Sequence, residues 1–214
     1  MIDSSPILNA KELLVVSAGY LLGCITSAYY WVRWRTGEDI RRQGSGNVGA
    51  RNAGRLLGRK AFAIVFLVDL AKGAAAVWLA RRFQLGENVV LVVMLAVVTG
   101  HIWPVQLRFQ GGKGLSTLAG VMLAFDWPLV LAVGGLAGAI GLFSRHAALS
   151  LLTAIAAAPA LAFLLGRGGA EIAGVAALAG LVLWAHRRNL REEIAGVPAG
   201  RPLKEAGLHT EAKS

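Results

Sequence analysis

Residues 88–106 read NVVLVVMLAVVTGHIWPVQ, an almost continuous apolar run that contains no acidic residue, lysine or arginine. Its length approaches the ~20 residues that an α-helix needs to cross the hydrocarbon core of a bilayer. Runs of the same kind cover residues 13–33 and 61–81. Over the whole chain of 214 residues, 56% are hydrophobic and the mean hydropathy is +0.58. That is more apolar surface than one soluble core can bury, so the sequence predicts an all-α membrane protein.

The second half of the chain predicts four more helices. Residues 115–143 are apolar but broken at Asp126-Trp127-Pro128, which indicates a short helix before the break and a fuller one after it. Two further runs, 147–165 and 171–186, are separated by a glycine-rich loop at 166–169. The total is about seven transmembrane helices, one of them short, or five to six if residues 115–125 form a re-entrant segment. Residues 1–200 are expected to form one polytopic membrane domain, and residues 201–214 a short, polar, disordered cytoplasmic tail.

Small residues inside the apolar runs predict sites of close helix packing. Gly19 and Gly23, and likewise Gly134 and Gly138, have the spacing that lets two helix backbones approach closely in lipid. The single cysteine, Cys24, leaves no disulfide framework and no cysteine metal site, and no two histidines have zinc-ligand spacing. We therefore expect neither a metal nor another cofactor.

The distribution of basic residues predicts the orientation. With seven spans the termini lie on opposite sides, and the side richer in Lys and Arg is cytoplasmic. Most of the 22 Lys and Arg residues fall on the side of the first, third and fifth loops and the carboxyl terminus. The amino terminus is then outside and the carboxyl terminus cytoplasmic, with Arg81 and Arg82 running against the rule. Basic cytoplasmic loops facing anionic lipid explain the net charge of +10, so no nucleic acid partner is required.

The first loop contains the segment from Gly44 to Asn52, which reads GSGNVGARN. Its glycines allow backbone N–H groups to turn inward as an anion-binding nest, while Asn and Ser side chains add hydrogen bonds and arginine adds charge. A phosphate or a carboxylate is the natural ligand of such a loop. A flexible basic loop at the lipid surface is the alternative, and this loop alone leaves both open.

The third loop favours an anion site. Gly100-His101-Ile102-Trp103-Pro104-Val105 leads into Gly111-Gly112-Lys113-Gly114 and then a new helix, whose amino terminus points donors at an anion. The loop is not a Walker A motif, because Gly114 stands where Ser or Thr is required and Leu107 where the leading glycine is required. Nucleotide hydrolysis is therefore disfavoured. His101 is either a substrate ligand or a structural histidine bonded to a backbone carbonyl.

Two polar groups lie within or at the end of predicted spans. Asp69 and Lys72 are one helical turn apart and share a face, where they either serve a functional site or form an ion pair that locks helices together. His186-Arg187-Arg188-Asn189 closes the last span. Positive-inside anchoring explains the arginines but not His186 and Asn189, which carry no permanent charge.

These motifs, in this order, resemble those of the bacterial acyl-phosphate:glycerol-3-phosphate acyltransferases, the PlsY family. The resemblance covers roughly residues 10–200. It rests on the first-loop segment, on Asp69-Leu70-Ala71-Lys72-Gly73, on the third-loop segment, and on His186-Arg187 with Asn189 and Gly196. Motifs of this length and order are poorly explained by chance.

The resemblance implies a seven-span enzyme of the bacterial cytoplasmic (inner) membrane that acts in phospholipid biosynthesis, with its active site facing the cytoplasm. The 1-hydroxyl of glycerol 3-phosphate attacks the acyl carbon of an acyl phosphate and gives lysophosphatidic acid. Neither acyl-CoA nor acyl carrier protein is required. We assign catalytic roles to Ser45, Lys113, His186 and Asn189, with His186 as base or orienting group unless a substrate phosphate accepts the proton. Substrate and phosphate binding is assigned to Gly44, Gly46, Asn47, Gly49, Arg51, Asn52, Asp69, Lys72, His101, Gly111, Gly112, Gly114, Arg145 and Arg187.

Four positions depart from the family pattern. Threonine is usual where Arg51 stands, serine at Ala148, arginine at Glu192 and glutamate at Pro198. Arg51 retains the ability to bind phosphate through a bidentate contact. Two other hypotheses therefore stay open: an inactive paralogue, and a transporter or flippase for a phosphorylated or lipidic anion, suggested by the intramembrane pair Asp69 and Lys72.

Overall fold

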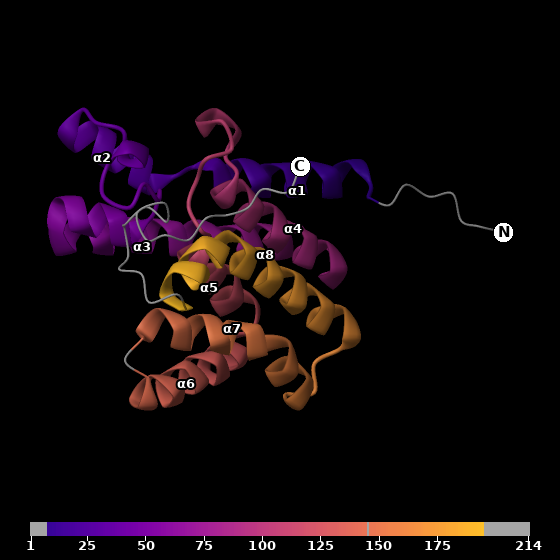
Figure 1. The fold of residues 1–214 in the computed structure, drawn as a ribbon. Coiled ribbons are helices and arrows are strands. Elements are labelled where there is room, and N and C mark those ends of the chain that lie inside the picture. The colour runs from indigo at the N-terminus through magenta and orange to yellow at the C-terminus, as the bar shows by residue number, and fades with distance from the viewer. Residues whose placement is uncertain (1–7, 145, 195–214) are drawn as a thin grey trace, which may run out of the picture.

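The computed structural model describes residues 8–144 and 146–194, and this part of the chain is all-helical (Figure 1). Two short 3-10 turns, η1 (Ile40–Arg42) and η2 (Val105–Leu107), lie in the first and third loops. The α-helices are α1 (Ala10–Cys24), α2 (Ser27–Thr36), α3 (Ala50–Arg82), α4 (Glu87–Ile102), α5 (Leu115–Phe125), α6 (Trp127–Phe143), α7 (Ala147–Leu164) and α8 (Gly169–Ile194).

Seven apolar segments follow one another along the described chain, which confirms an all-helical membrane fold. Five are long enough to cross a bilayer, with bounds Ala10–Thr36, Ala50–Arg82, Glu87–Leu107, Ala147–Leu164 and Gly169–Arg188. The other two are α5 and α6, with 11 and 17 residues. They meet at Asp126, which ends α5 and caps α6, so the break expected at Asp126-Trp127-Pro128 is confirmed.

The first span differs from the continuous helix expected over residues 13–33. The helix is broken at Ile25 and Thr26, whose backbone φ and ψ angles are not helical, and α2 continues beyond the break. The apolar pattern does not reveal the break, because its freed carbonyls are satisfied by side chains that come from distant parts of the sequence. The second span also begins earlier than residue 61, since α3 starts at Ala50 and kinks at Gly58, where φ is 82°.

Glycines let α1 pack on α4 and α3 pack on α5. A methyl group at Gly23 would collide with the Val97 carbonyl, and one at Gly100 with the Tyr20 carbonyl. Gly19 lies against Val93, which confirms the packing role expected for the first glycine pair.

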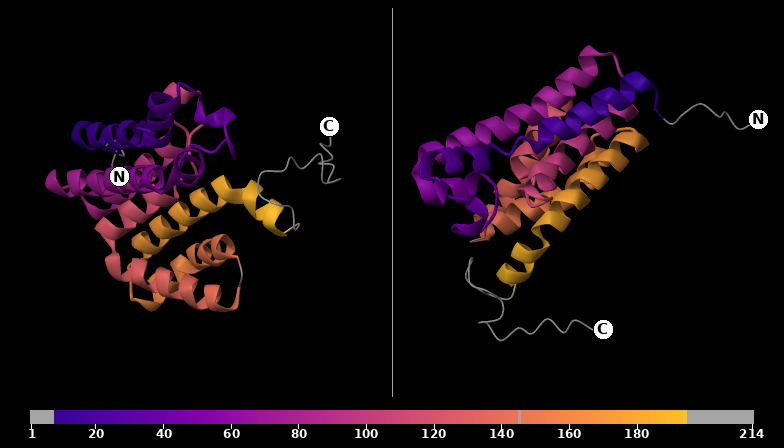
Figure 2. Two further views of the ribbon diagram at one scale, coloured as in Figure 1. Left: turned by 90° about the vertical axis from the view of Figure 1, so that its left-hand side faces the viewer. Right: turned by 90° about the horizontal axis from the view of Figure 1, so that it is seen from above.

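The second glycine pair behaves differently. A Cβ at Gly134 or Gly138 would meet no atom within 4 Å, so the expected helix packing at these positions is wrong for the described residues. The spacing of small residues shows that a helix face is smooth, but not whether another helix covers it. The hairpin of α6 and α7 instead packs below α8, away from α1 and α2 (Figure 2).

Arg81 and Arg167 stabilise the junction between α5 and α6. The Arg81 guanidinium donates to the carbonyls of Ala124 and Phe125 at 2.7 and 3.2 Å. Arg167 makes a bidentate ion pair with Asp126, with N–O distances of 2.7 and 2.8 Å. Two basic residues on the side poor in positive charge thus have local partners that account for them.

The interface between α3 and α5 gives a test of this packing. Gly120→Ala would push a methyl group into the Leu70 carbonyl and against the Ala74 N–H, so we expect a loss of about 1–3 kcal/mol of stability. The matched control is Gly138→Ala, where the added methyl group meets open space. Heating each variant in detergent and measuring the fraction of protein that stays monodisperse gives an unfolding midpoint for each. Equal midpoints for the two variants would contradict the proposed contact.

Candidate active site

The break in the first span is stabilised by Lys72. Its Nζ donates to the carbonyls of Gly23 and Ile25, at 3.0 and 2.7 Å. Gln106 of η2 donates to the intervening carbonyl of Cys24. An unsatisfied carbonyl in hydrocarbon costs several kcal/mol, so these donors allow the helix to break inside the membrane. The positive charge also lies at the carboxyl end of α1, where the helix dipole favours it.

Lys72 and Asp69 form the ion pair that their spacing predicts, with Nζ and Oδ1 3.1 Å apart. Both side chains are buried, with 4% and 1% exposed. Ser27 Oγ donates to the same carboxylate at 2.9 Å and thereby ties α2 to α3. Of the two roles considered for this pair, the contacts match an ion pair that locks helices together. Substrate binding by Asp69 and Lys72 stays a prediction.

His101 connects this buried pair to the polar loops. Its Nδ1 lies 2.9 Å from Lys72 Nζ. An ammonium group only donates, so Nδ1 accepts and the ring proton is on Nε2. A side chain at Gly112 would collide with His101 Nε2 and approach the Val48 carbonyl at 2.5 Å. The Nδ1 of His101 is therefore bonded to a side chain and not to a backbone carbonyl, at the point where the first and third loops meet. Substrate binding by His101 stays a prediction.

The third loop folds back on the end of α4. The N–H groups of Gly111 and Gly112 donate to the carbonyls of Ile102 and His101 at 3.1 and 3.0 Å. These two N–H groups are engaged within the protein, and substrate binding by Gly111 and Gly112 stays a prediction. Gly114, in the left-handed region with φ of 80°, then begins α5. The first N–H groups of α5 lack helical acceptors and lie beside Lys113.

Asn52 shapes the first loop from inside. Its buried amide accepts from the Ser45 N–H at 3.0 Å and donates to the Gln43 carbonyl at 2.9 Å. Gly44 and Gly46 have φ of 56° and 69°, so only glycine adopts this path without strain. The amide of Asn52 thus positions the loop, while the side chain of Ser45 is left exposed.

Other first-loop residues sit at the start of α3 or link the loops. Gly49 caps α3, and a Cβ there would come within 2.9 Å of the Asn47 amide. Arg41 is paired with Asp39 and donates to the Leu107 carbonyl at 3.0 Å, which joins the first and third loops. Hydrogen bonding by that guanidinium holds the pKa of Asp39 below its ordinary value.

His186 faces this assembly from α8. Its Nδ1 lies 2.8 Å from the carbonyl of Val182. A carbonyl only accepts, so Nδ1 carries the proton and Nε2 is left as an acceptor. The charges of Lys113 and Arg51 act on this half-buried ring, so the structure brings together three residues from different loops and helices. His186 has the ring tautomer opposite to that of His101.

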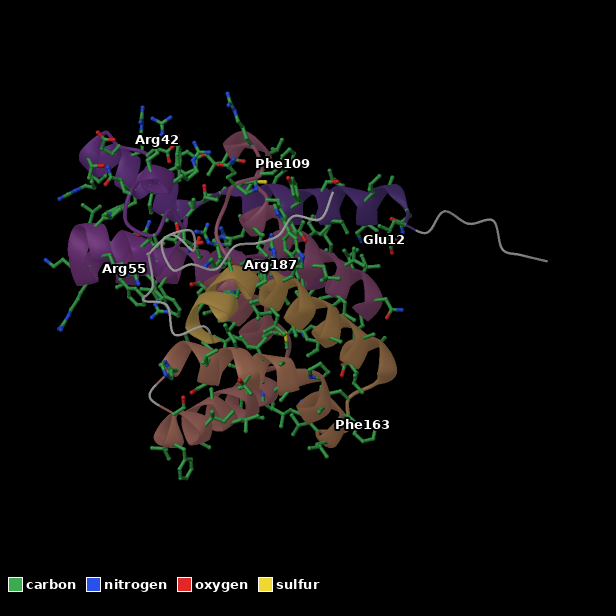
Figure 3. The ribbon with its side chains drawn as sticks, viewed as in Figure 1. Glu12, Arg42, Arg55, Phe109, Phe163 and Arg187 are labelled. Atoms are coloured by element: carbon green, nitrogen blue, oxygen red, sulfur yellow. The ribbon has the colours of Figure 1, made fainter. Side chains whose placement is uncertain are left out.

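Arg187 has a different arrangement. It stacks on the Trp184 ring, with 3.7 Å between the guanidinium carbon and the ring centroid. Trp184 in turn contacts Trp103 of the third loop, with ring centroids 5.2 Å apart. Figure 3 shows Arg187 near the middle of the molecule and Arg55 toward one end. Trp184 therefore joins α8 to the third loop, and Arg187 packs on that indole; substrate binding by Arg187 stays a prediction.

Two hollows adjoin the loops. A basic groove of about 340 Å³ is lined by Arg51, Gly54, Arg55, Arg59 and Phe62. Sequence reasoning missed Arg55 and Arg59 as candidate site residues. The spacing of four between Arg51 and Arg55 could have indicated a shared side of the helix, whereas Arg59 lies beyond the kink at Gly58.

An apolar cavity of about 310 Å³ lies among α3, α5, α6, α7 and α8 and is lined by Phe66, Leu115 and Met122, among others. Phe62 of the groove stacks on Phe66 of the cavity, with ring centroids 6.0 Å apart and planes at 6°. The polar and the apolar hollow thus share a wall.

Some predicted residues lie outside the described part of the chain. They are Arg145, Gly196, Pro198 and the tail 201–214. Asn189 and Glu192 belong to α8, but their side chains are not described. Within residues 8–144 and 146–194, no group of three or more His, Cys, Asp or Glu side chains is arranged to hold a metal ion.

The fold and the site together are those of an integral membrane protein with a basic, histidine-containing site beside an apolar cavity. The family model described as "Glycerol-3-phosphate acyltransferase" matches residues 13–196, and the chain belongs to this family of membrane enzymes. The resemblance seen in the motifs is confirmed.

Individual members of the family are similar to the chain over most of its length. The chain is 42% identical over 182 residues to Glycerol-3-phosphate acyltransferase 1 of Desulfitobacterium hafniense (strain Y51), covering 85% of this chain and 90% of that one. It is 41% identical over 186 residues to the enzyme of Synechococcus sp. (strain CC9902), covering 87% and 93%.

Solved structures show the same fold. The crystal structure of PlsY, an integral membrane glycerol 3-phosphate acyltransferase, in its glycerol 3-phosphate form has a TM-score of 0.81 and 32% identity, covering 93% of this chain and 100% of that one. The lysophosphatidic acid form has a TM-score of 0.77 and 31% identity, covering 87% and 93%.

The buried pair gives a second test. Lys72→Met leaves the Asp69 carboxylate without its counter-ion and two carbonyls without a donor, so we expect a loss of about 3–5 kcal/mol of stability. Adding Asp69→Asn removes the buried charge, and the double variant should lose less than the sum of the two single variants. Thermal unfolding of all four proteins in detergent completes the cycle. Additive losses would show that the two side chains do not interact.

Proposed function

We propose that this glycerol-3-phosphate acyltransferase takes its acyl group from an acyl phosphate and transfers it to the 1-hydroxyl of glycerol 3-phosphate, giving lysophosphatidic acid. The observation that carries the donor is the shared wall of stacked Phe62 and Phe66 between the basic groove and the apolar cavity. A phosphate head and one acyl chain are the two parts that such adjoining hollows fit. An acyl phosphate has both in a single molecule.

The reaction balances without another reactant. The 1-hydroxyl oxygen bonds to the acyl carbon, the bond from that carbon to the bridging phosphate oxygen breaks, and inorganic phosphate leaves. The protein must hold two phosphate groups in line and stabilise the charge that develops on the carbonyl oxygen. Arg51, Arg55 and Arg59 supply positive charge for one phosphate group. Lys113 and the first turn of α5 supply donors for the developing oxyanion and the second phosphate group.

Proton transfer is assigned to His186. Its Nδ1 proton is held by the Val182 carbonyl, so Nε2 is free to accept a proton from the attacking hydroxyl. The charges of Lys113 and Arg51 act on the ring, and Lys113 is assigned the phosphate of the acceptor. If a phosphate oxygen of the substrate takes the proton instead, the same geometry makes His186 the group that orients the hydroxyl. Ser45, with its exposed side chain, and Asn189 complete the proposed catalytic set.

The position of Arg51 supports activity rather than a dead paralogue. Where the family pattern has threonine, this chain places a guanidinium on the wall of the basic groove, beside Arg55. Arginine binds phosphate through two parallel hydrogen bonds, so the replacement adds a ligand of the required charge. Ala148, where the family pattern has serine, is half-buried in the first turn of α7.

The transport alternative has less support. It was suggested by Asp69 and Lys72 inside the membrane, but these side chains are buried and engaged with each other and with backbone carbonyls. These contacts favour a structural role and add no support for transport.

We further propose that the site faces the cytoplasm of a bacterial inner membrane. Arg42 and Arg55 lie at the end of the molecule opposite Glu12 (Figure 3). Of the two residues that run against the charge rule, Arg81 is held by the α5–α6 junction, as is Arg167 on the same side, whereas Arg82 is exposed. The excess of basic residues in the first and third loops supports the basic end as the cytoplasmic one.

The direct experiment supplies the purified protein with acyl phosphate and glycerol 3-phosphate and measures lysophosphatidic acid. Parallel reactions contain acyl-CoA or acyl carrier protein carrying the same acyl group. We expect product only with acyl phosphate. Product from either of the other donors alone, or none from any donor while a competent relative is active, would refute the proposal.

Two substitutions test the assigned residues. His186→Ala should lower kcat by roughly 10²–10⁴-fold through lost proton transfer or orientation. Lys113→Ala should lower it by roughly 10²–10³-fold through lost stabilisation of the oxyanion. Lys60→Ala, an exposed lysine outside the groove, is the matched control and should keep full turnover. Near-normal kcat in both site variants would rule out this site.

Orientation is tested with single cysteines in a Cys24→Ser background. Arg42→Cys and Glu87→Cys are both exposed and lie on opposite sides of the proposed membrane. A membrane-impermeant maleimide added to intact cells should label only Glu87→Cys, and lysis should expose Arg42→Cys. The reverse pattern would invert the topology.

A further inference from the structure

The apolar cavity has one wall of regular helical spacing. Leu115, Leu118, Ala119 and Met122 of α5 line it at intervals of three and four residues, so one face of that helix follows the cavity from end to end. Leu115 comes directly after Lys113 and Gly114, at the polar site. Met122 is seven residues further along the helix, which is about 10 Å at 1.5 Å per residue. The cavity therefore begins beside the reacting groups and runs into the membrane.

The far part of the cavity is closed on one side and open on another. Met122 and Leu129 are buried, with 8% and 1% exposed. Gly134 of α6 also lines the cavity, yet it is exposed, and a Cβ built there meets no atom within 4 Å. The missing side chain thus leaves a gap in the wall formed by α6.

We infer that the acyl chain of the substrate lies along the α5 face of this cavity and leaves it for the bilayer through the gap at Gly134, so that Gly134 sets the chain length the enzyme accepts. This inference rests on the proposed acyl phosphate donor. A depth of about 10 Å holds only part of a long acyl chain, so a long chain needs an exit. The surrounding lipid is as apolar as the lining residues, so the emerging end of the chain meets no polar barrier there.

The occupant follows from continuity with the polar site. Phe66 belongs to the cavity and stacks on Phe62 of the basic groove, so a phosphate head in the groove leaves its chain at the entrance to the cavity. A second helix would not fit a hollow of about 310 Å³ that is already bounded by five helices. One flexible chain matches both its shape and its apolar lining.

Gly134→Leu tests the inference, because the added side chain enters open space rather than a packed interface. We expect kcat/KM with palmitoyl phosphate to fall by about tenfold or more, since each methylene denied apolar contact changes affinity by about fourfold. Octanoyl phosphate, whose chain stays within the cavity, should be used at the wild-type rate. Retained octanoyl transfer also shows that the variant is folded.

Gly135→Leu is the matched control. Gly135 is the next residue of α6, is equally open to an added Cβ, and is not among the residues that line the cavity. It should leave the ratio of palmitoyl to octanoyl transfer unchanged. Gly134→Val, with a smaller side chain, provides the same comparison if Gly134→Leu does not purify, and should shift the ratio in the same direction.

The outcomes separate this inference from the proposed donor. If the wild-type protein uses acyl phosphate and the Gly134 variants keep its chain-length ratio, the inference is wrong and the proposed function stands. An equal loss with both chain lengths also overturns it. If wild-type protein gives no product with acyl phosphate, the donor is wrong, and the same comparison is made by binding palmitoyl and octanoyl lysophosphatidic acid. Weaker binding of only the palmitoyl form to Gly134→Leu would then support the gap.

Discussion

The hydrogen bonds from Lys72 to the carbonyls of Gly23 and Ile25 hold the rest of the site in place. A helix that breaks inside hydrocarbon needs a donor for each freed carbonyl, and a lysine ammonium supplies several at once. That ammonium needs a counter-ion, which is Asp69, and its remaining neighbour is His101. Because His101 lies against Gly112, the position of the third loop depends on the same charge that stabilises the broken span.

The two histidines of the site show how a neighbour determines what a ring can do. Lys72 donates to His101, which places a proton on the nitrogen nearest the loops, whereas the Val182 carbonyl keeps the proton of His186 on the opposite nitrogen. One ring therefore offers a donor and the other an acceptor. Residue type alone does not distinguish them.

Much of the fold was predictable because the apolar runs are long and Asp126-Trp127-Pro128 interrupts one of them with a charge and a proline. The break at Ile25 was not, because apolar residues continue through it and the stabilising donors lie far along the chain. The spacing of Asp69 and Lys72 predicted a shared face and left a functional site and an ion pair both open, because their burial beside backbone carbonyls depends on tertiary contacts. Gly134 was misassigned for a similar reason, since spacing does not show what a helix face meets.

Chain order adds a consequence for biogenesis. The carbonyls of Gly23 and Ile25 leave the ribosome well before Lys72, which satisfies them from a later span. Until that span arrives, the first span either stays a straight helix or remains in contact with water at the insertion machinery. The bend in the first span is thus completed only after α3 has been synthesised, and the Cys24 carbonyl obtains its donor later still, from Gln106 of η2.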